Sequence, residues 1–489
     1  MTSKAQAQAQ YVRGTMVKTA DGLFRVDAFR DNFIVGHRIV PVSSIVPALA
    51  SGKSKCTGVH ALSSIEENIP VSRAVRRVTN PLVGGTTYRW TPGSLRLDYH
   101  EPPTKYAQLD NLRSIDVFAG AGLMSHGSHM AGCTCVGAVE WDRHACETFA
   151  HNHPDAIVQE GDVADLLIDD GVLGKALAAG LHFNVLMGGS PCQPFSKMTH
   201  GARDDKVINT NPLQLFCDLV RKYKPAIVVH ENVPDIMDPL PPYNSPYALL
   251  VKALIECGYA FEFKNVCMAE HGVPQMRQRN LCVAVRMDMN LQLPTFPEPT
   301  TKAHKTVPIR GFMRQMFPLA VQVAPSHLPY APTAKEACGD LENIPVQSLE
   351  HQSTGNAVRK YTRRSINNNK RMRWVPYQKR ARHGAGDVVH NHVAPRRPFE
   401  SLATHDTQNE HAPFNTITTQ STQHAAGTRH YNKRMKRIFS LRELCRAQGV
   451  PDTFVLKGPY TAARRQVGNG VPSLYAKTLF AKITEYVCK

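Results

Sequence analysis

Short apolar runs and amphipathic stretches alternate along the middle of this 489-residue chain. The runs 115–118, 134–139, 183–187 and 226–230 have the length and composition of buried strands, and stretches of helical type cover 143–149, 213–222 and 246–256. Strands that alternate with helices are typical of a doubly wound, mostly parallel sheet. The pattern therefore predicts a Rossmann-like α/β fold.

The pattern of apolar and polar residues is different on both sides of this region. Residues 14–42 contain short apolar stretches around an Asp-Gly pair, which is typical of small hairpins, and several prolines interrupt 50–110. Residues 287–439 are rich in proline, histidine and basic residues, and a helical pattern resumes at 441. We therefore expect four parts: a β-rich extension at 1–110, disordered at 1–15; an α/β domain at 111–286; a variable basic region at 287–439; and a return to the α/β domain at 440–489.

Basic residues are concentrated in one part of the chain. The formal net charge is +18, and within 351–440 the 17 lysines and arginines less the 4 acidic residues leave +13. Such a balance indicates a polyanionic partner, nucleic acid first and an anionic membrane surface second, although a solvated basic surface has the same composition. No run of 18 apolar residues predicts a membrane span, so we expect no membrane partner.

One of the twelve cysteines has the sequence context of a nucleophile. Cys192 lies in a loop rich in glycine and proline that follows an apolar run, where a substrate can reach a thiol. The alternative is a buried structural cysteine. Cys133 and Cys135 are the only close pair, and no Cys/His ladder predicts zinc. We therefore expect reduced thiols and no metal site.

A glycine-rich turn and two acidic residues predict a nucleotide-like ligand. The turn Asp116-x-Phe118-x-Gly120-x-Gly122 follows the first strand, Glu140 ends the second, and Asp162 stands where a third strand ends. Glycines let the backbone approach such a ligand, and an acidic residue after the second strand commonly binds ribose hydroxyls. An ordinary tight turn is the alternative. No P-loop lysine is present, which favours a phosphate-free adenosyl ligand.

Two further motifs place polar groups near the same sheet edge. Glu231 follows the apolar run 226–230, so it lies where open α/β sheets carry their sites. Its carboxyl group can share a proton with a ring nitrogen, or it can belong to a structural ion pair. Arg277 and Arg279 alternate along an extended segment, which predicts that both point to one face.

The order of these motifs closely resembles that of the DNA (cytosine-5) methyltransferases. The resemblance covers about 113–285 and 413–485, and it rests on eight motifs in the family's order: Asp116–Gly122, Glu140-Trp141-Asp142, Gly161-Asp162, Pro191-Cys192-Gln193, Glu231-Asn232-Val233, Gln275-x-Arg277-x-Arg279, the run from Arg442 to Asp452, and the run from Gln466 to Pro472. Any one of them is weak evidence, but eight in order are specific. The resemblance implies a methyltransferase fold that binds S-adenosyl-L-methionine, with a smaller target-recognition domain at 287–439.

The resemblance also assigns roles to the residues that match. On the cofactor side Phe118 stacks on adenine, Gly120 and Gly122 give the backbone clearance, and Glu140 binds the ribose. Trp141 flanks the adenine, Asp162 accepts from its amino group, and Asn469 closes the pocket together with Pro191. On the base side the expected attack is by Cys192 on C6 of a flipped cytosine, while Glu231 bonds N3, Arg279 bonds O2 and Arg277 orients Glu231 or the loop.

The chain departs from the family at three positions. Leu123 stands where a further glycine is usual, Asn184 where an aspartate is common, and Val450 where a phenylalanine is usual. None of them removes a catalytic group, so an active enzyme is expected.

Three readings of the family resemblance differ in substrate and activity. The first is a DNA (cytosine-5-)-methyltransferase that acts on double-stranded DNA. The second is an RNA methyltransferase, but the tRNA-modifying branch of this fold carries a Cys-Phe-Thr tripeptide that is absent here. The third is an inactive paralogue, against which Cys192, Glu231 and Arg279 argue. The length of the N-terminal extension favours a eukaryotic, nuclear enzyme, with cytoplasm or nucleoid expected for a bacterial one.

Overall fold

The computed structural model describes residues 16–19, 22–30, 33–41, 60–70, 74–78, 87–91, 94–99, 102–191, 212–237, 246–304, 320–343, 408–419 and 439–489. The expected disorder at 1–15, the loop that contains Cys192, and most of the basic segment 351–440 lie outside these residues.

The centre of the molecule is a sheet whose first five strands are parallel. Its order is β10-β9-β8-β11-β12, followed by β15 and β13. The bounds are β8 (Arg113–Val117), β9 (Thr134–Glu140), β10 (Ile157–Glu160), β11 (Val185–Gly188), β12 (Ile227–Asn232), β13 (Tyr259–Cys267) and β15 (Gln278–Arg286). Strand β15 is antiparallel to both β12 and β13. The predicted doubly wound, mostly parallel sheet is confirmed, with β15 as the reversed strand.

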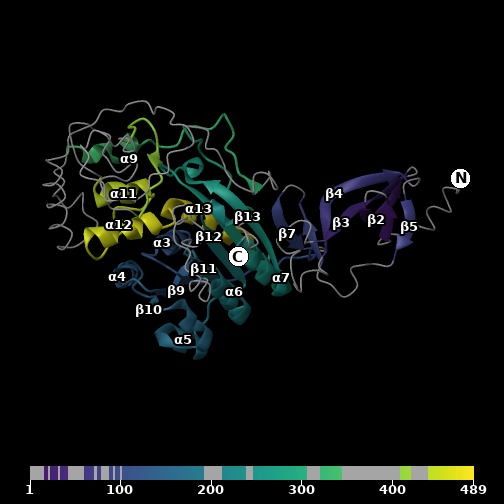
Figure 1. The fold of residues 1–489 in the computed structure, drawn as a ribbon, viewed down its shortest axis with the longest axis horizontal. Helices are drawn as coiled ribbons and strands as arrows, with labels where there is room; N and C mark the ends of the chain where they lie inside the picture. The colour runs from purple at the N-terminus through teal and green to yellow at the C-terminus, as the bar shows by residue number, and fades with distance from the viewer. Residues whose placement is uncertain are drawn as a thin grey trace, which may run out of the picture.

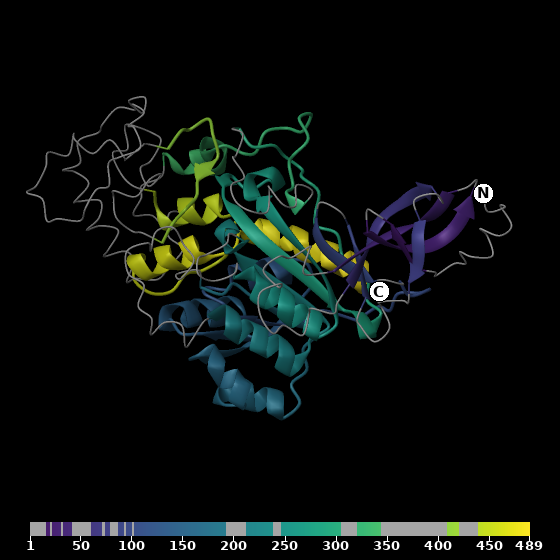
Figure 2. The same cartoon turned by 45° about the vertical axis from the view of Figure 1, so that its right-hand side comes forward.

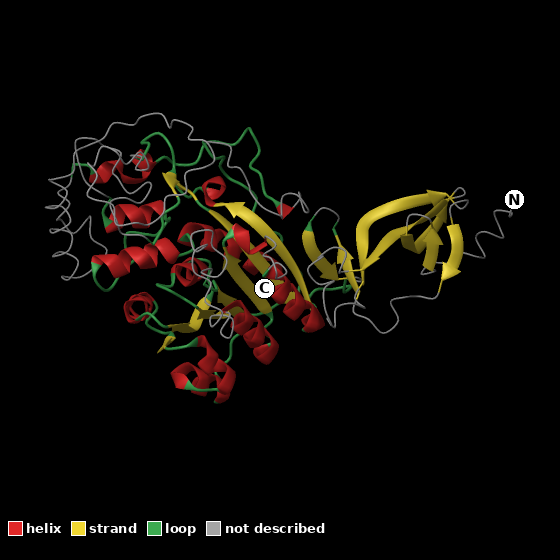
Figure 3. Ribbon diagram, in the orientation of Figure 1, coloured by secondary structure: helices red, strands yellow, loops and turns green. Residues whose placement is uncertain are grey.

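Helices cover both faces of this sheet, as Figure 3 shows in red. One face packs against α5 (Gly171–Ala178), α6 (Pro212–Tyr223) and α7 (Tyr247–Glu256), and the other against α3 (Leu123–His129), α4 (Arg143–Asn152) and α13 (Ser473–Val487). The strands between these layers are buried on both sides: all four residues of β11 and all six of β12 are buried. This double burial is why the parallel strands read as continuous apolar runs in the sequence.

Asn184 explains one departure from the family pattern. Its amide oxygen accepts from the N–H of Arg113 at 2.8 Å, and its amide nitrogen donates to the carbonyl oxygen of Asn111 at 2.7 Å. The side chain thus joins the chain before β11 to the start of β8. An aspartate has no donor when ionised, so it cannot make the second bond.

The N-terminal extension continues the same sheet. From β13 the order runs on through β7 (Leu95–Tyr99), β6 (Thr87–Trp90), β4 (His60–Pro70), β3 (Phe33–Pro41), β2 (Gly22–Arg30), β1 (Met16–Thr19) and β5 (Ala74–Val78). The predicted hairpins at 14–42 are confirmed by the antiparallel pairs β1–β2 and β2–β3. Figures 1 and 2 show these strands as a lobe that projects from the α/β domain on the side of β7.

Arg96 joins the extension to the α/β domain. Its guanidinium contacts Glu262 of β13 at 2.6 Å and Asp98 at 2.9 Å, and it also donates to the carbonyl oxygens of Leu293 and Pro294. Residues Phe261–Phe263 of β13 pair with β7 in antiparallel register, so Arg96 lies directly opposite Glu262. Without β7, strand β13 would be an open edge of the sheet.

A third apolar core lies at the other end of the molecule. It includes residues of α9 (Ala334–Cys338), α11 (Leu441–Ala447), α12 (Tyr460–Asn469) and β16 (Phe414–Asn415), which pairs with β14 (Gln275–Met276). Capping boxes fix the starts of α9 and α11, with Thr333–Glu336 and Ser440–Glu443. The short helical turns are η4 (Val163–Ile168), η7 (Pro234–Met237), η8 (Met268–His271), η9 (Met287–Met289) and η11 (Gly339–Leu341). No helix among the described residues is long and apolar enough to cross a membrane.

Replacing Arg96 by methionine tests how firmly the extension is joined. The substitution keeps most of the aliphatic volume but leaves the buried Glu262 without its cation, so we expect unfolding to require about 2 kcal/mol less free energy. Chemical denaturation measures the change. The control Arg143→Met breaks an exposed pair with Glu147 and should cost less than about 0.5 kcal/mol. Equal, small losses in both variants would contradict the role of Arg96.

Candidate active site

The predicted site residues follow strands that end at one edge of the sheet. Strands β8, β9, β10, β11 and β12 are parallel, so the residues after their carboxyl ends meet there. The chain leaves β8 toward β9 and β10 and then returns to β11 on the other side of β8. Such a reversal opens a crevice at the carboxyl ends of the strands, which is where open α/β sheets bind ligands.

The turn after β8 has an unusual backbone. Phe118 has a φ of 56°, Gly120 of 56° and Gly122 of 79°. A left-handed conformation costs an ordinary residue roughly 1–2 kcal/mol, so the strain at Phe118 is typical of a functional turn. The following helix α3 starts directly from Gly122, and the hydroxyl of Ser125 in α3 donates to Asp116 in β8 at 2.6 Å. Burial raises the pKa of Asp116 to about 7, against the opposing bond from Ser125.

The two glycines of this turn serve different purposes. A Cβ atom at Gly120 would have no heavy atom within 4 Å, so this position opens toward free space, as expected for backbone that a ligand approaches. A Cβ atom at Gly122 would lie 2.6 Å from the buried ring of Phe149. The expected clearance at Gly122 is therefore needed for packing against α4, because the ring of Phe149 fills that space.

Glu140 is held by the backbone around it. One carboxylate oxygen accepts from the N–H of Gly120 at 2.8 Å, and the other accepts from the N–H groups of Trp141 and Asp142. Burial raises the pKa of Glu140, and these three bonds oppose that shift because they stabilise the carboxylate. The contacts join the ends of β8 and β9 and fix the carboxylate beside the open space at Gly120.

The other cofactor candidates lie at the surface of the same edge. The side chain of Trp141 is 81% exposed, although it is large and apolar. Asp162 is exposed and caps η4 by accepting from the N–H of Ala164, which leaves its second oxygen available. Asn469 is exposed at the end of α12. A cluster of exposed groups around an open turn has the composition of a ligand site.

Leu123 connects the cofactor turn to the last motif of the chain. It is buried, and a Cβ atom at Gly470 would lie 2.4 Å from its side chain. Its carbonyl oxygen accepts from the hydroxyl of Ser473 at the start of α13. The leucine that replaces the usual glycine is therefore accommodated by a glycine on the facing segment. Asn469, next to Gly470, is held close to the turn by this contact.

The loop of Cys192 starts from two glycines that need their small size. A Cβ atom at Gly188 would lie 2.4 Å from the carbonyl oxygen of Val117, and one at Gly189 would lie 2.9 Å from Oε2 of Glu231. Pro191 is exposed, and Cys192 itself lies outside the described residues. The chain that leads to Cys192 therefore starts in direct contact with the carboxylate of Glu231.

Glu231 and Arg279 form an ion pair at the end of β12. Nε of Arg279 lies 2.7 Å from Oε1 of Glu231, and the two side chains are 14% and 10% exposed. Strand β15 runs antiparallel to β12 with Leu281 opposite Glu231, so its first residues reach the site edge. The contact is an ion pair rather than a directed hydrogen bond, since Oε1 of Glu231 is buried with no hydrogen-bond partner among the described residues.

Arg277 and Arg279 have different partners in the structure. Strand β14 ends at Met276 and β15 begins at Gln278, so Arg277 lies at the break between them. It is buried, and it donates to the carbonyl oxygen of Ile417 at 3.2 Å. Arg279, by contrast, pairs with Glu231 at the end of β12, and the common face of the two arginines stays a prediction.

Sequence reasoning missed several residues that organise this edge. Gln275 is fully buried and bonds to the backbone of Ile417 and Ala447 and to the side chain of Gln448, so it joins β14 to the third core. Ser190 and His230 form a buried contact beside Glu231. Their signals in the sequence are a serine two residues before Cys192 and a histidine at the end of an apolar run.

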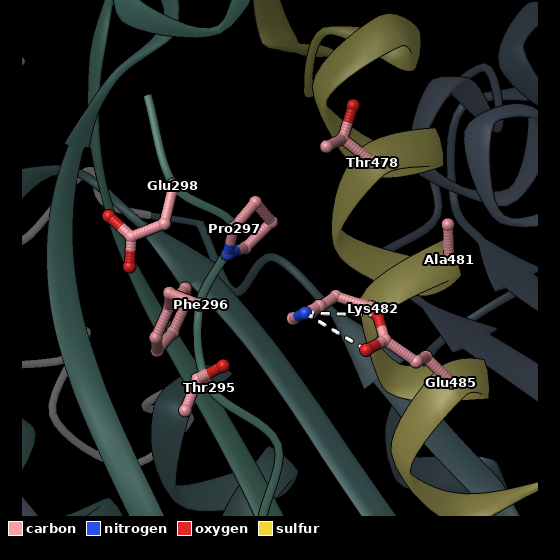
Figure 4. Close-up of a pocket in the computed structure, with 8 residues that line it drawn as sticks. All are labelled: Thr295, Phe296, Pro297, Glu298, Thr478, Ala481, Lys482 and Glu485. Carbon is pink, nitrogen blue, oxygen red and sulfur yellow. Dashed lines mark hydrogen bonds and ion pairs between the residues drawn. The ribbon is translucent and has the colours of Figure 1, made fainter. Parts of the chain in front are cut away.

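A cavity of about 550 Å³ lies elsewhere, between α13 and residues 295–298 (Figure 4). Its lining includes Thr478, Lys482 and Glu485 of α13, and Lys482 pairs with Glu485 at 2.9 Å. None of the predicted catalytic or cofactor residues lines it. The chemistry at the strand ends therefore locates the site better than the cavity does.

Comparisons with known proteins identify the family of this chain. Residues 112–485 match the family model of the C-5 cytosine-specific DNA methylase. The chain belongs to the C-5 cytosine-specific DNA methylases. It is therefore a DNA (cytosine-5-)-methyltransferase, and S-adenosyl-L-methionine is its methyl donor.

Individual relatives of the methyltransferase come from bacteria and from a sea urchin. The chain is 28% identical to the type II methyltransferase M.NgoFVII of Neisseria gonorrhoeae, over 75% of this chain and 86% of the relative. It is 24% identical to the DNA (cytosine-5)-methyltransferase PliMCI of Paracentrotus lividus, over 76% of this chain and 28% of that longer protein. A solved structure of S. pombe Dnmt2 methyltransferase is 15% identical, covers 77% of this chain and 99% of its own, and has a TM-score of 0.47.

Alanine at Gly120 and at Gly122 should affect the methyltransferase in different ways. Both variants strain a left-handed residue by about 1 kcal/mol. Gly122→Ala also forces a methyl group into the ring of Phe149, so we expect a total loss of about 2–4 kcal/mol of stability. For Gly120→Ala we expect the free energy of unfolding to fall by little more than the cost of the backbone strain. The same variant should bind S-adenosyl-L-methionine about tenfold or more weakly. Chemical denaturation and isothermal titration calorimetry measure the two effects. Equal stability losses would contradict the assignment.

Proposed function

We propose that the methyltransferase modifies C5 of a cytosine flipped out of double-stranded DNA, through a covalent bond between Cys192 and C6. The observation that carries the proposal is the buried pair of Glu231 and Arg279. Oε1 of Glu231 has no hydrogen-bond partner among the described residues, although the residue is only 7% exposed. Its contact with Arg279 is an ion pair without an aligned hydrogen bond, so this buried oxygen keeps acceptor capacity that a ligand can use.

The proposed chemistry follows from these residue types. The thiolate of Cys192 adds to C6 of cytosine while Glu231 holds a proton at N3, which makes C5 electron-rich. Bound S-adenosyl-L-methionine supplies an electrophilic methyl group to C5. Loss of the C5 proton to a base then lets the electrons of that C–H bond restore the C5–C6 double bond, and the thiolate of Cys192 leaves. Arg279, which holds Glu231, binds the O2 oxygen of the base.

The cofactor binds at the turn after β8. In the proposal the ring of Phe118 stacks on adenine, Trp141 flanks it, and Asp162 accepts from its amino group. Glu140 binds the ribose hydroxyls with lone pairs that its three backbone contacts leave free. Gly120 provides the open approach, and Gly122 positions α3. Asn469 and Pro191 complete the rim of this pocket.

Two observations favour double-stranded DNA as the substrate: the positive charge of the chain and the position of C6 in a stacked base. The segment 351–440 carries 17 basic residues against 4 acidic ones, which suits phosphate contacts. C6 of a stacked cytosine is shielded, so the base must leave the duplex to meet a thiol. We propose the division 1–110, 111–286, 287–439 and 440–489, with target recognition in 287–439. We also propose a nuclear location in a eukaryotic host, with a role in epigenetic marking, and a nucleoid location in a bacterial one.

Replacing Cys192 by serine tests the nucleophile. A hydroxyl group is a far weaker nucleophile at neutral pH, so transfer of tritiated methyl to duplex DNA should fall at least about a thousandfold. S-adenosyl-L-methionine binding should stay within twofold, since no described cofactor contact changes. A parallel incubation with tRNA serves as the substrate control. Normal activity of the variant, or label found only in tRNA, would contradict the proposal.

The salt dependence of DNA binding tests the basic region. If about six to ten phosphates are neutralised, affinity should fall roughly 10³- to 10⁵-fold between 50 and 200 mM salt. Fluorescence anisotropy of a labelled duplex measures the binding constant across the titration. In a variant with glutamine in place of the basic doublets Arg363-Arg364 and Lys370-Arg371, the logarithm of the affinity should fall less steeply with the logarithm of the salt concentration. A binding constant that does not change with salt would exclude the phosphate contacts.

A further inference from the structure

Two side chains of β12 hold the last described residues before Cys192. Nε2 of His230 lies 3.0 Å from Oγ of Ser190, and Nδ2 of Asn232 donates to the carbonyl oxygen of Ser190 at 3.0 Å and to its Oγ at 3.2 Å. The three residues are 4%, 2% and 3% exposed for Ser190, His230 and Asn232. Bulk water therefore has little access to compete for these contacts.

The donors and acceptors of this network match. The amide nitrogen of Asn232 only donates, so Oγ of Ser190 accepts from it and directs its own proton to Nε2 of His230. Burial lowers the pKa of His230 to about 3, so the imidazole is neutral, and Nε2 accepts in the tautomer that carries its proton on Nδ1. The ring of Phe216 packs against the imidazole with 4.8 Å between ring centroids. The imidazole of His230 thus packs against Phe216 and forms its hydrogen bond with Ser190.

The network connects the two groups of the proposed reaction. His230 and Asn232 flank Glu231 in β12, and side chains alternate along a strand. The carboxylate of Glu231 therefore lies on one face of β12, and the side chains of His230 and Asn232 contact Ser190 from the other face. Only Pro191 lies between Ser190 and Cys192, and two steps along the chain span at most about 7 Å. Fixing Ser190 therefore limits the distance over which the proposed nucleophile can move.

We propose that His230 is a positioning residue for methyl transfer, which acts with Asn232 to fix Ser190 and thereby the placement of Cys192 relative to Glu231. The inference rests on the proposed roles of Cys192 and Glu231. The competing explanation is that His230 only fills space against Phe216. The two explanations differ in what happens when the hydrogen bond is removed and the volume is kept.

Single-turnover adduct formation separates these explanations. The probe is duplex DNA that contains 5-fluorocytosine, incubated with S-adenosyl-L-methionine. After thiol addition and methyl transfer, C5 carries fluorine where a proton would be lost, so the thiolate cannot be eliminated and the adduct accumulates. Ser190→Ala and His230→Leu each remove one side of the bond, and each should slow adduct formation about tenfold. The double variant should be no slower than Ser190→Ala alone, because Ser190→Ala already removes the bond to His230 together with the contact from Asn232 to Oγ. Affinity for S-adenosyl-L-methionine should stay within twofold.

Two further variants make the result specific. His230→Gln keeps a side-chain oxygen that can accept from Ser190 and should recover adduct formation to within threefold of the unmodified protein. Tyr247→Phe removes another buried hydroxyl, whose oxygen has no hydrogen-bond partner among the described residues, and should change the rate less than twofold. Thermal denaturation of each variant reports the loss of stability independently of the adduct.

The outcomes are distinct. Ser190→Ala and His230→Leu variants that melt at lower temperature yet form the adduct at the normal rate would show that His230 is only structural, and would overturn the inference while leaving the proposed function intact. Failure of the unmodified protein to form any adduct would instead overturn the proposed nucleophile, and the inference with it. A slow adduct in both variants, with rescue by His230→Gln, is the expected result.

Discussion

The site depends on the parallel pairing of β8, β11 and β12. Because these strands run in the same direction, the turn with Phe118, the loop with Cys192 and the carboxylate of Glu231 all leave the sheet at one edge. The pairing is stabilised by complete burial of β11 and β12 between two helical layers. Burying a strand on both faces removes the freedom to shift register, since every shift would expose apolar side chains or bury polar ones. The precision of the site therefore comes from the core.

Small residues allow the parts of this site to approach one another. Gly189 gives room to the carboxylate of Glu231, and Gly470 gives room to Leu123. A third example is Gly127 in α3, where a Cβ atom would lie 2.4 Å from the carbonyl oxygen of Ser473 at the start of α13. The helix that follows the cofactor turn is thus pressed against the helix that ends the chain. This packing couples the two ends of the methyltransferase domain, which are far apart in the sequence.

The sequence predicted the features that depend on local pattern and missed those that depend on long-range pairing. The apolar run 226–230 marked β12, and the expected helix at 246–256 appears at Tyr247–Glu256. The join of β7 to β13 rests on contacts such as that between Arg96 and Glu262, 166 residues apart, for which no local pattern exists. The bond from Arg277 to Ile417, 140 residues apart, likewise depends on long-range packing. The family resemblance named Glu231, whereas only the structure shows that Arg279 is its ion partner.

The central claim is that a thiol adjoining this strand edge bonds covalently to cytosine. Its most direct test is peptide mapping by mass spectrometry of the complex trapped on duplex DNA with 5-fluorocytosine, in the presence of S-adenosyl-L-methionine. The account predicts that the modified nucleotide is attached to the peptide that contains Cys192 and to no peptide with another of the twelve cysteines. Attachment to a different cysteine, or a trapped complex without any covalent bond, would contradict it.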